Sequence, residues 1–289
     1  LIYSFTGENF IFDAQPYGGA ICQALKRTEW CGLEHLKEVN GQYMLLITNE
    51  ANETQYTDEL KLVIVDHPKE VKVVPDIFGR IHTFSQPITP LRAHDDKGRD
   101  LLPFVSKDDR VFWHTRLNER DSDKREEPRD ELIFEFPKPK GAKGARLWVN
   151  AGTTLWGSEM GKRILDLQGN KITEWYNEVN TFGPAFQRLM SWFFNEELYL
   201  LQIRMETKDG WETKGIIYGS GPLISEDKAY VIDISDVPDD TLKIKLLPPV
   251  NFWTLNYIAI DYTEDSPIES KEIEAVKAVD SVGEDLRGI

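Results

Sequence analysis

The stretch that decides the fold class is Tyr230–Asp265, YVIDISDVPDDTLKIKLLPPVNFWTLNYIAIDYTED. Apolar and polar residues alternate through Ala229–Ile234, Leu242–Leu246 and Leu255–Asp261. A period of two is typical of strands that bury one face. Segments rich in Asp, Pro and Asn separate the three runs, as turns do between strands. The stretch therefore predicts three consecutive strands of a β-sheet.

Similar runs occur upstream in the chain. Tyr3, Phe5, Phe10 and Phe12 flank a turn at 6–9, which predicts an aromatic hairpin. VKVVPDIFGRIHTF predicts a second hairpin that turns near Ile77–Gly79. Further predicted strands are Tyr43–Thr48, Leu60–Asp66, Leu132–Phe136, Arg146–Asn150, Leu198–Thr207 and Glu212–Tyr218, the last two joined by a turn at 208–211.

A helical insertion is predicted between two of these strands, over residues 155–197. Its first half repeats apolar residues at helical spacing, and Pro184 suits the first turn of a second helix. The apolar positions are Trp156, Met160, Ile164 and Leu167, then Phe186, Leu189, Met190, Phe193 and Phe194. We expect the insertion to cover one sheet, with a protein–protein surface as the alternative.

The strongest compositional boundary is NERDSDKREEPRD at 118–130, in which ten of thirteen residues are charged. Such a segment predicts a linker or an exposed loop. We therefore divide the chain into an N-terminal β domain at 1–117, the linker, and a jelly-roll-like domain at 131–289. The predicted fold class is mainly β, with two β-sandwich units and the helical insertion in the second.

Two segments of the chain resemble each other. LKLVIVDH at 60–67 aligns with LNYIAIDY at 255–262, and AHDDKGRDL at 93–101 aligns with AVDSVGEDL at 278–286. The second pair shares Asp95/Asp280, Gly98/Gly283, Asp100/Asp285 and Leu101/Leu286. The pattern predicts two related β units in tandem, the second incomplete at residue 289. Chance convergence of short strands and Asp/Gly turns is the alternative.

The block Tyr230–Asp265 resembles the closing strands of a galactose-binding-like jelly roll. The opening Ile2–Phe12 and the segment Gln42–Pro68 resemble modules of large secreted bacterial proteins that accompany FG-GAP or tetratricopeptide repeats. This resemblance covers about half the chain and implies an extracytoplasmic scaffold or recognition module. It supplies no catalytic residue.

Composition and charge restrict the classes of partner that the chain is expected to bind. The net charge of −15, from 49 acidic and 34 basic residues, disfavours a nucleic acid partner. No apolar stretch approaches the roughly 20 residues of a membrane span. The chain begins at Leu1 without a charged-then-apolar leader, so we expect a removed signal peptide or a segment of a longer protein. In a secreted chain, Cys22 and Cys31 would close a disulfide.

Linear signatures of catalysis are missing from the sequence. The histidines are dispersed, HExxH and GxSxG do not occur, and neither GxGxxG nor a P-loop is present. Paired carboxylates leave no linear signature, so a glycoside hydrolase stays open as a third possibility. The leading prediction is a non-enzymatic extracellular structural or interaction module, and the second is a carbohydrate-binding module.

Two weaker candidate sites remain. Asp95, Asp96 and Asp100 surround Gly98 and offer oxygen ligands for Ca²⁺, although an Asp/Gly hairpin turn that joins two strands is the favoured interpretation. No other cofactor is expected. Trp211 lies at a predicted hairpin tip, where an exposed indole would stack on a sugar; packing against a neighbouring loop is the alternative.

Overall fold

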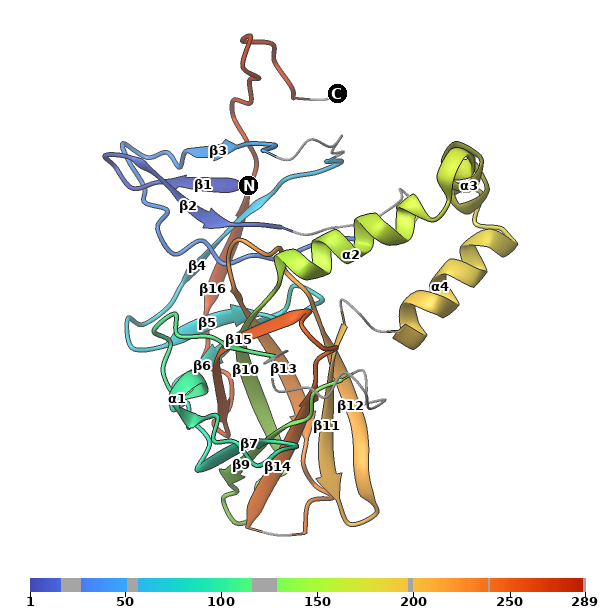
Figure 1. The fold of residues 1–289 in the computed structure, drawn as a ribbon. Coiled ribbons are helices and arrows are strands. Elements are labelled where there is room, and N and C mark those ends of the chain that lie inside the picture. The colour runs from blue at the N-terminus through green and yellow to red at the C-terminus, as the bar shows by residue number, and fades with distance from the viewer. Residues whose placement is uncertain (17–26, 51–56, 116–128, 197–199, 239, 288–289) are drawn as a thin grey trace.

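The centre of the protein is a two-layer sandwich of antiparallel sheets (Figure 1). The computed structural model describes residues 1–16, 27–50, 57–115, 129–196, 200–238 and 240–287. One sheet has the order β13-β10-β15-β8, with bounds Glu226–Asp233, Gly144–Thr153, Trp253–Asp261 and Trp113–His114. The other has the order β12-β11-β14-β9-β7, with bounds Gly210–Tyr218, Leu200–Thr207, Thr241–Leu247, Leu132–Pro137 and Arg92–Asp95.

The core lies between these two sheets and follows from the period-two pattern. Alternate residues of each strand are buried, as in Leu132, Phe134 and Phe136 of β9. Leu147 and Val149 of β10 meet them from the facing sheet. The mainly-β fold class is therefore confirmed, and the strand runs of Tyr230–Asp265 form β13, β14 and β15 as predicted.

Smaller sheets surround the sandwich. β1 (Ile2–Phe5) pairs with β2 (Phe10–Ala14) and with β3 (Leu45–Ile47), which confirms the aromatic hairpin. The hairpin of β5 (Lys72–Pro75) and β6 (Ile81–Phe84) lies against the outer face of the four-stranded sheet, where Val74 and Phe84 pack on Trp148. β4 (Leu62–Asp66) pairs with β16 (Glu269–Ile273).

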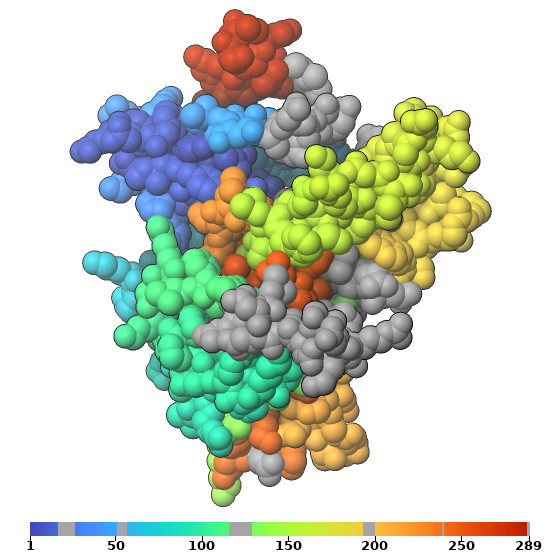
Figure 2. Space-filling model, in the orientation of Figure 1, coloured from blue at the N-terminus to red at the C-terminus, as the bar shows by residue number. Residues whose placement is uncertain are grey.

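The helical insertion forms between β10 and β11, as predicted. It contains α2 (Leu155–Asp166), the 3-10 turn η3 (Gly169–Lys171), α3 (Ile172–Asn180) and α4 (Pro184–Glu196). Thr154 caps α2 by accepting from the Gly157 N–H. These helices project from the side of the sandwich as an arm (Figures 1 and 2). A short helix, α1 (Leu102–Val105), follows β7.

The predicted division at 118–130 falls between strands of one sandwich. β7 pairs with β9, and β8 pairs with β15, so strands from before the charged segment complete both sheets. The charged segment connects β8 of one sheet to β9 of the other, and the sequence pattern does not distinguish such a connection within one sandwich from a domain linker. Residues 116–128 lie outside the described residues.

The prediction that the two similar strands are equivalent parts of a tandem repeat is wrong. β4 belongs to a two-stranded sheet with β16, whereas β15 lies inside the four-stranded sheet between β10 and β8. Local apolar alternation does not encode the neighbour of a strand, so two similar runs adopted different partners. The Asp/Gly turns of the two segments are equivalent, as described below. No helix among the described residues is long and apolar enough to cross a membrane.

Candidate functional site

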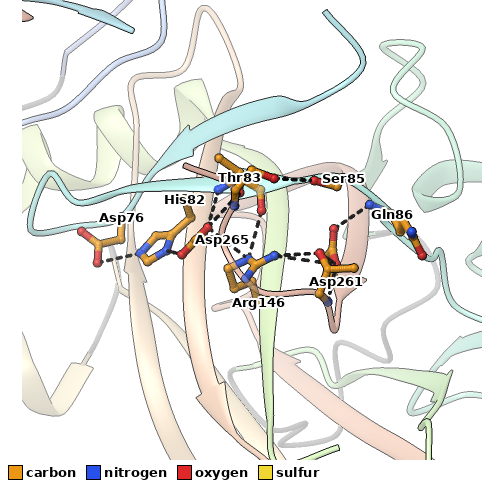
Figure 3. Close-up of polar contacts among 10 residues, drawn as sticks. Asp76, His82, Thr83, Ser85, Gln86, Arg146, Asp261 and Asp265 are labelled. Carbon is orange, nitrogen blue, oxygen red and sulfur yellow. Dashed lines mark hydrogen bonds and ion pairs between the residues drawn. The ribbon is translucent and has the colours of Figure 1, made fainter. Parts of the chain in front are cut away.

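A network of polar side chains joins the β5–β6 hairpin to the four-stranded sheet (Figure 3). The residues that we call the polar junction are Asp76, His82, Thr83, Arg146, Asp261 and Asp265. They come from the hairpin, from β10, from the end of β15 and from the segment that follows it. The polar junction thus connects segments far apart in the sequence.

His82 lies between two carboxylates of the polar junction. Its Nδ1 is 3.0 Å from Asp265 Oδ2, and its Nε2 is 3.4 Å from Asp76 Oδ2. Asp265 Oδ1 also accepts from the Thr83 N–H at 2.6 Å and from the Thr83 hydroxyl at 3.1 Å. These contacts fix β6 to the segment after β15.

Arg146 supplies the positive charge beneath the hairpin. Its guanidinium donates to the Thr83 carbonyl at 3.0 Å and lies 3.7 Å from Asp261 Oδ1 and 3.5 Å from Asp265 Oδ1. Burial opposes ionisation of Asp265, but the Thr83 N–H, His82 and Arg146 outweigh it and lower the pKa of this carboxyl. Most of the polar junction is buried, so we assign it to stabilisation of the fold rather than to ligand binding.

A second group of polar side chains lies on the outer face of the four-stranded sheet, where the β5–β6 hairpin packs. This group, the sheet-face cluster, comprises Lys72, Asp108, Trp148, Asn150, Asp227, Asn256 and Tyr257. Alternate residues of β10 and β13, with Tyr257 of β15, point to this face, and an irregularity in the pairing of β10 with β15 brings the adjacent Asn256 to them.

A chain of hydrogen bonds in the sheet-face cluster connects the carboxylate of Asp108 to that of Asp227. Asn256 Nδ2 donates to Asp108 Oδ1 at 2.6 Å and to Asn150 Oδ1 at 3.1 Å. Asn150 Nδ2 and Trp148 Nε1 each donate to Asp227 Oδ1 at 2.8 Å. Within the described part of the chain, the buried Asn256 Oδ1 has no hydrogen-bond partner.

The charges of the sheet-face cluster influence one another. Partial burial and the Asp227 charge raise the pKa of Asp108. Burial disfavours the Lys72 cation, but Asp227, whose Oδ2 lies 2.8 Å from Nζ, and Glu34 outweigh this effect and raise the pKa of Lys72. Mixed donors and acceptors suit a polyhydroxyl ligand, yet Trp148 is only 8% exposed beneath Phe84 and Tyr257. Its ring is not an open platform for a sugar.

The helical arm carries an open apolar groove of about 270 Å³ between α2 and α4. Its apolar lining consists of Ile164, Leu165, Trp175, Ala185, Leu189 and Trp192. In the buried cluster of the arm, α3 supplies Val179 and α4 supplies Ala185 and Leu189. None of the described residues of α2 belongs to that cluster; Met160 of α2 packs instead against the sandwich core, and Ile164 and Leu165 line the groove.

The wall of the groove also carries polar groups, Gln168 and Arg188. Among the described residues, no carboxylate forms an ion pair with the exposed Arg188. Further apolar side chains are exposed on the arm, including Leu167 at 83% and Phe182 at 61%. The arm therefore buries only part of its apolar surface, whereas the cover over a sheet that we first expected would bury more of it.

The three-stranded N-terminal sheet also exposes apolar side chains on one face. Tyr3 pairs with Phe12 and with Leu46 across the sheet, and Phe5 pairs with Phe10. Phe10 and Leu46 are more than 40% exposed. Contiguous exposed apolar residues are typical of surfaces that contact other molecules.

The Asp95–Asp100 segment forms a turn whose Asp95 carboxylate is already occupied. Asp95 Oδ1 accepts from the Lys97 and Arg99 N–H groups, and the Arg99 guanidinium pairs with Oδ2. Asp100 accepts from the Leu102 N–H at the start of α1. No group of three or more His, Cys, Asp or Glu side chains among the described residues is placed to hold a metal ion. The arrangement favours the structural turn over the Ca²⁺ site.

The same turn occurs three times among the residues that the structure describes. Asp76, Asp95 and Asp280 each accept through Oδ1 from the N–H groups two and four residues later. In each turn the third residue after the Asp is a glycine with φ between +76° and +87°. The sequence comparison detected two of these turns, whereas the third, at Asp76, was not recognised as equivalent.

The remaining predicted site residues are placed as follows. Cys31 is a free, partly buried thiol, and Cys22 lies outside the described residues, so the predicted disulfide is not found. Burial and the nearby Glu226 carboxylate raise the pKa of the Cys31 thiol. Trp211 is partly buried, and Lys245 Nζ lies 4.4 Å from the centre of its ring. Packing of Trp211 against Lys245 leaves less of the ring for a sugar.

Comparison of the chain with protein-family models, with curated proteins and with solved structures finds no match.

Proposed function

We propose that this protein is a non-enzymatic interaction module of a larger extracellular assembly and that the helical arm is its contact surface. The observation that carries the proposal is the groove between α2 and α4, whose apolar walls are left open. Apolar side chains that are contiguous along an open groove are typical of surfaces that contact another molecule.

The position of the arm suits a contact role. It projects beside the sandwich, away from the polar junction that holds the hairpin in place (Figures 1 and 2). A sandwich that is internally complete gives a rigid support, while an insertion between β10 and β11 supplies the contact residues. The exposed face of the N-terminal sheet would offer a second contact in the same assembly.

Carbohydrate binding is the second candidate, and the sheet-face cluster favours it. A partnerless Asn256 Oδ1 beside Asp108, Asn150 and Asp227 is the kind of polar group that a bound hydroxyl would satisfy. The buried Trp148 weighs against a stacked sugar. The interaction module is therefore placed first.

Site-specific photo-crosslinking in the cells that produce the protein tests the proposal. A photoreactive residue in place of Leu165, which lines the groove, should yield one defined crosslinked protein. The same photoreactive residue in place of Lys208, at the exposed turn between β11 and β12, serves as the control and should yield no crosslinked protein. Equal or absent crosslinking at both positions would count against the arm as a contact surface. Saturable glycan binding that Asp227→Ala abolishes would favour the second candidate.

A further inference from the structure

We infer that the occupant of the groove is an amphipathic helix of a partner chain, with an acidic residue beside its apolar stripe. This inference rests on the proposed function, because it names the partner chemistry for the same surface. It draws on three properties of the groove: its length, its apolar lining and its single charged group.

The shape of the groove matches a helix. On α4 the lining extends from Ala185 to Trp192, which is roughly 10 Å at about 1.5 Å per residue. Trp175 of α3 lines the groove where the two helices connect, and α2 contributes residues of its last turn. About two turns of an incoming helix match such a length and can contact both helices, which is a common mode of peptide recognition.

The apolar lining repeats at helical spacing on α4. Ala185, Leu189 and Trp192 follow one another at i, i+4 and i+7, so they form one continuous stripe. Ile164 and Leu165 of α2 form the opposite wall. An incoming helix with a matching apolar stripe would bury both walls. Two tryptophans at the contact are typical of residues that contribute strongly to binding.

The charge expected on the partner helix follows from Arg188. It is the one charged side chain in the described lining, it is exposed, and the structure describes no carboxylate that pairs with it. An acidic residue on the flank of the incoming helix would pair with Arg188 at the edge of the contact. Charges at such an edge select among partners more than they add affinity, so an acidic helix should be preferred over a basic one.

A charge-reversal experiment with two synthetic peptides tests the inference. Both are 14-residue amphipathic helices with the same Leu stripe, and the residues beside the stripe are Glu in one and Lys in the other. Fluorescence anisotropy of the labelled peptides measures affinity for the full chain. The wild type should bind the Glu peptide about three- to tenfold more tightly than the Lys peptide. Arg188→Glu should reverse this preference, and Leu189→Asp should abolish binding of both peptides.

The matched control is Lys162→Glu, which reverses a charge on an exposed residue of α2 outside the lining. It should leave the preference for the Glu peptide unchanged. Binding of neither peptide, equal binding of both, or the same loss of preference in Lys162→Glu would overturn the inference. So would a concentration-dependent dimer, measured by light scattering, that Leu189→Asp dissociates, because the occupant would then be a second copy.

The two proposals can fail separately. A Leu165 crosslink that maps to a strand or loop of its partner would overturn the helical occupant and leave the interaction module standing. Loss of both the crosslink and peptide binding would remove both proposals.

Discussion

The Thr83 N–H donates a 2.6 Å hydrogen bond to Asp265 Oδ1, a residue 182 positions further along the chain. This contact attaches the β5–β6 hairpin to the segment after β15, and the same carboxylate accepts from the Thr83 hydroxyl. Phe84, the next residue, then packs with its ring centre 5.5 Å from that of Trp148. One carboxylate thus positions the hairpin that covers the outer face of the sheet.

Asp265→Ala should destabilise the protein by about 1–3 kcal/mol, because the buried Thr83 N–H loses its acceptor. Chemical denaturation measures the loss, and hydrogen exchange should show faster exchange in β5 and β6 than in β10. Asp96→Ala, at an exposed carboxylate of another turn, is the control and should change stability by less than about 0.5 kcal/mol. Equal losses in the two variants would contradict the role of Asp265.

The polar junction should make the hairpin sensitive to acid. The pKa of Asp265 is lowered as described, and the pKa of Asp76 is lowered because Arg80, the Phe78 N–H and His82 outweigh its burial. Carboxyls with a lowered folded-state pKa stabilise the fold above their unfolded value and lose that contribution as the pH falls below about 4. Melting temperatures between pH 6 and 2.5 should therefore fall less steeply for Asp265→Asn than for the wild type. Parallel curves would show that Asp265 does not contribute.

The three equivalent turns permit a matched test of backbone and packing. Gly79 and Gly98 have nearly the same φ, +79° and +76°. A Cβ on Gly98 meets open space, whereas a Cβ on Gly79 would lie 2.1 Å from the Trp30 ring. Gly98→Ala should therefore cost only the left-handed strain of about 1–2 kcal/mol, and Gly79→Ala should cost clearly more. Equal unfolding free energies would mean that Trp30 moves aside without cost.

The features that the sequence predicted correctly are those encoded by residues close together in the chain. The Asp/Gly turns were predicted because all their hydrogen bonds close within five residues. The long strands and α2 were predicted because their periodicity extends over a whole element. α3 was not recognised as a separate helix within the predicted insertion, since nine residues give too short a pattern, and β8 was missed because it has two residues.

Features that depend on strand order could not be predicted from one sequence. β4 and β15 have similar apolar patterns, but their neighbours differ. The sheet-face cluster brings Asp108 beside Asn256, 148 positions away, and no linear motif marks that meeting. For the groove, the helical spacing of the insertion indicated two of the lining residues, Ile164 and Leu189, while the groove itself depends on how the helices of the arm pack.

Lys228, on the outer strand β13 of the sandwich, is a buried cation. Lys228 Nζ lies 2.8 Å from Glu226 Oε2, 2.8 Å from the Trp30 carbonyl and 3.3 Å from Glu29 Oε1. Lys228→Met should destabilise the protein by about 3–5 kcal/mol at pH 7.5, because it leaves Glu226 buried without its partner cation. The double variant Glu226→Gln/Lys228→Met should recover part of this loss.

The pH dependence of the Lys228→Met variant gives the sharper result. Burial already raises the pKa of Glu226, although Lys228 opposes the shift, and removing Lys228 should raise it further. The cost of a buried carboxylate with a raised pKa appears as the pH rises above its unfolded value of about 4.3 and grows until the folded-state pKa is reached. The stability difference between the variant and the wild type should therefore shrink between pH 7.5 and 5.5, as Glu226 takes up a proton. A difference that is constant over this range would show that lost packing of the lysine stem, rather than the uncompensated carboxylate, causes the destabilisation.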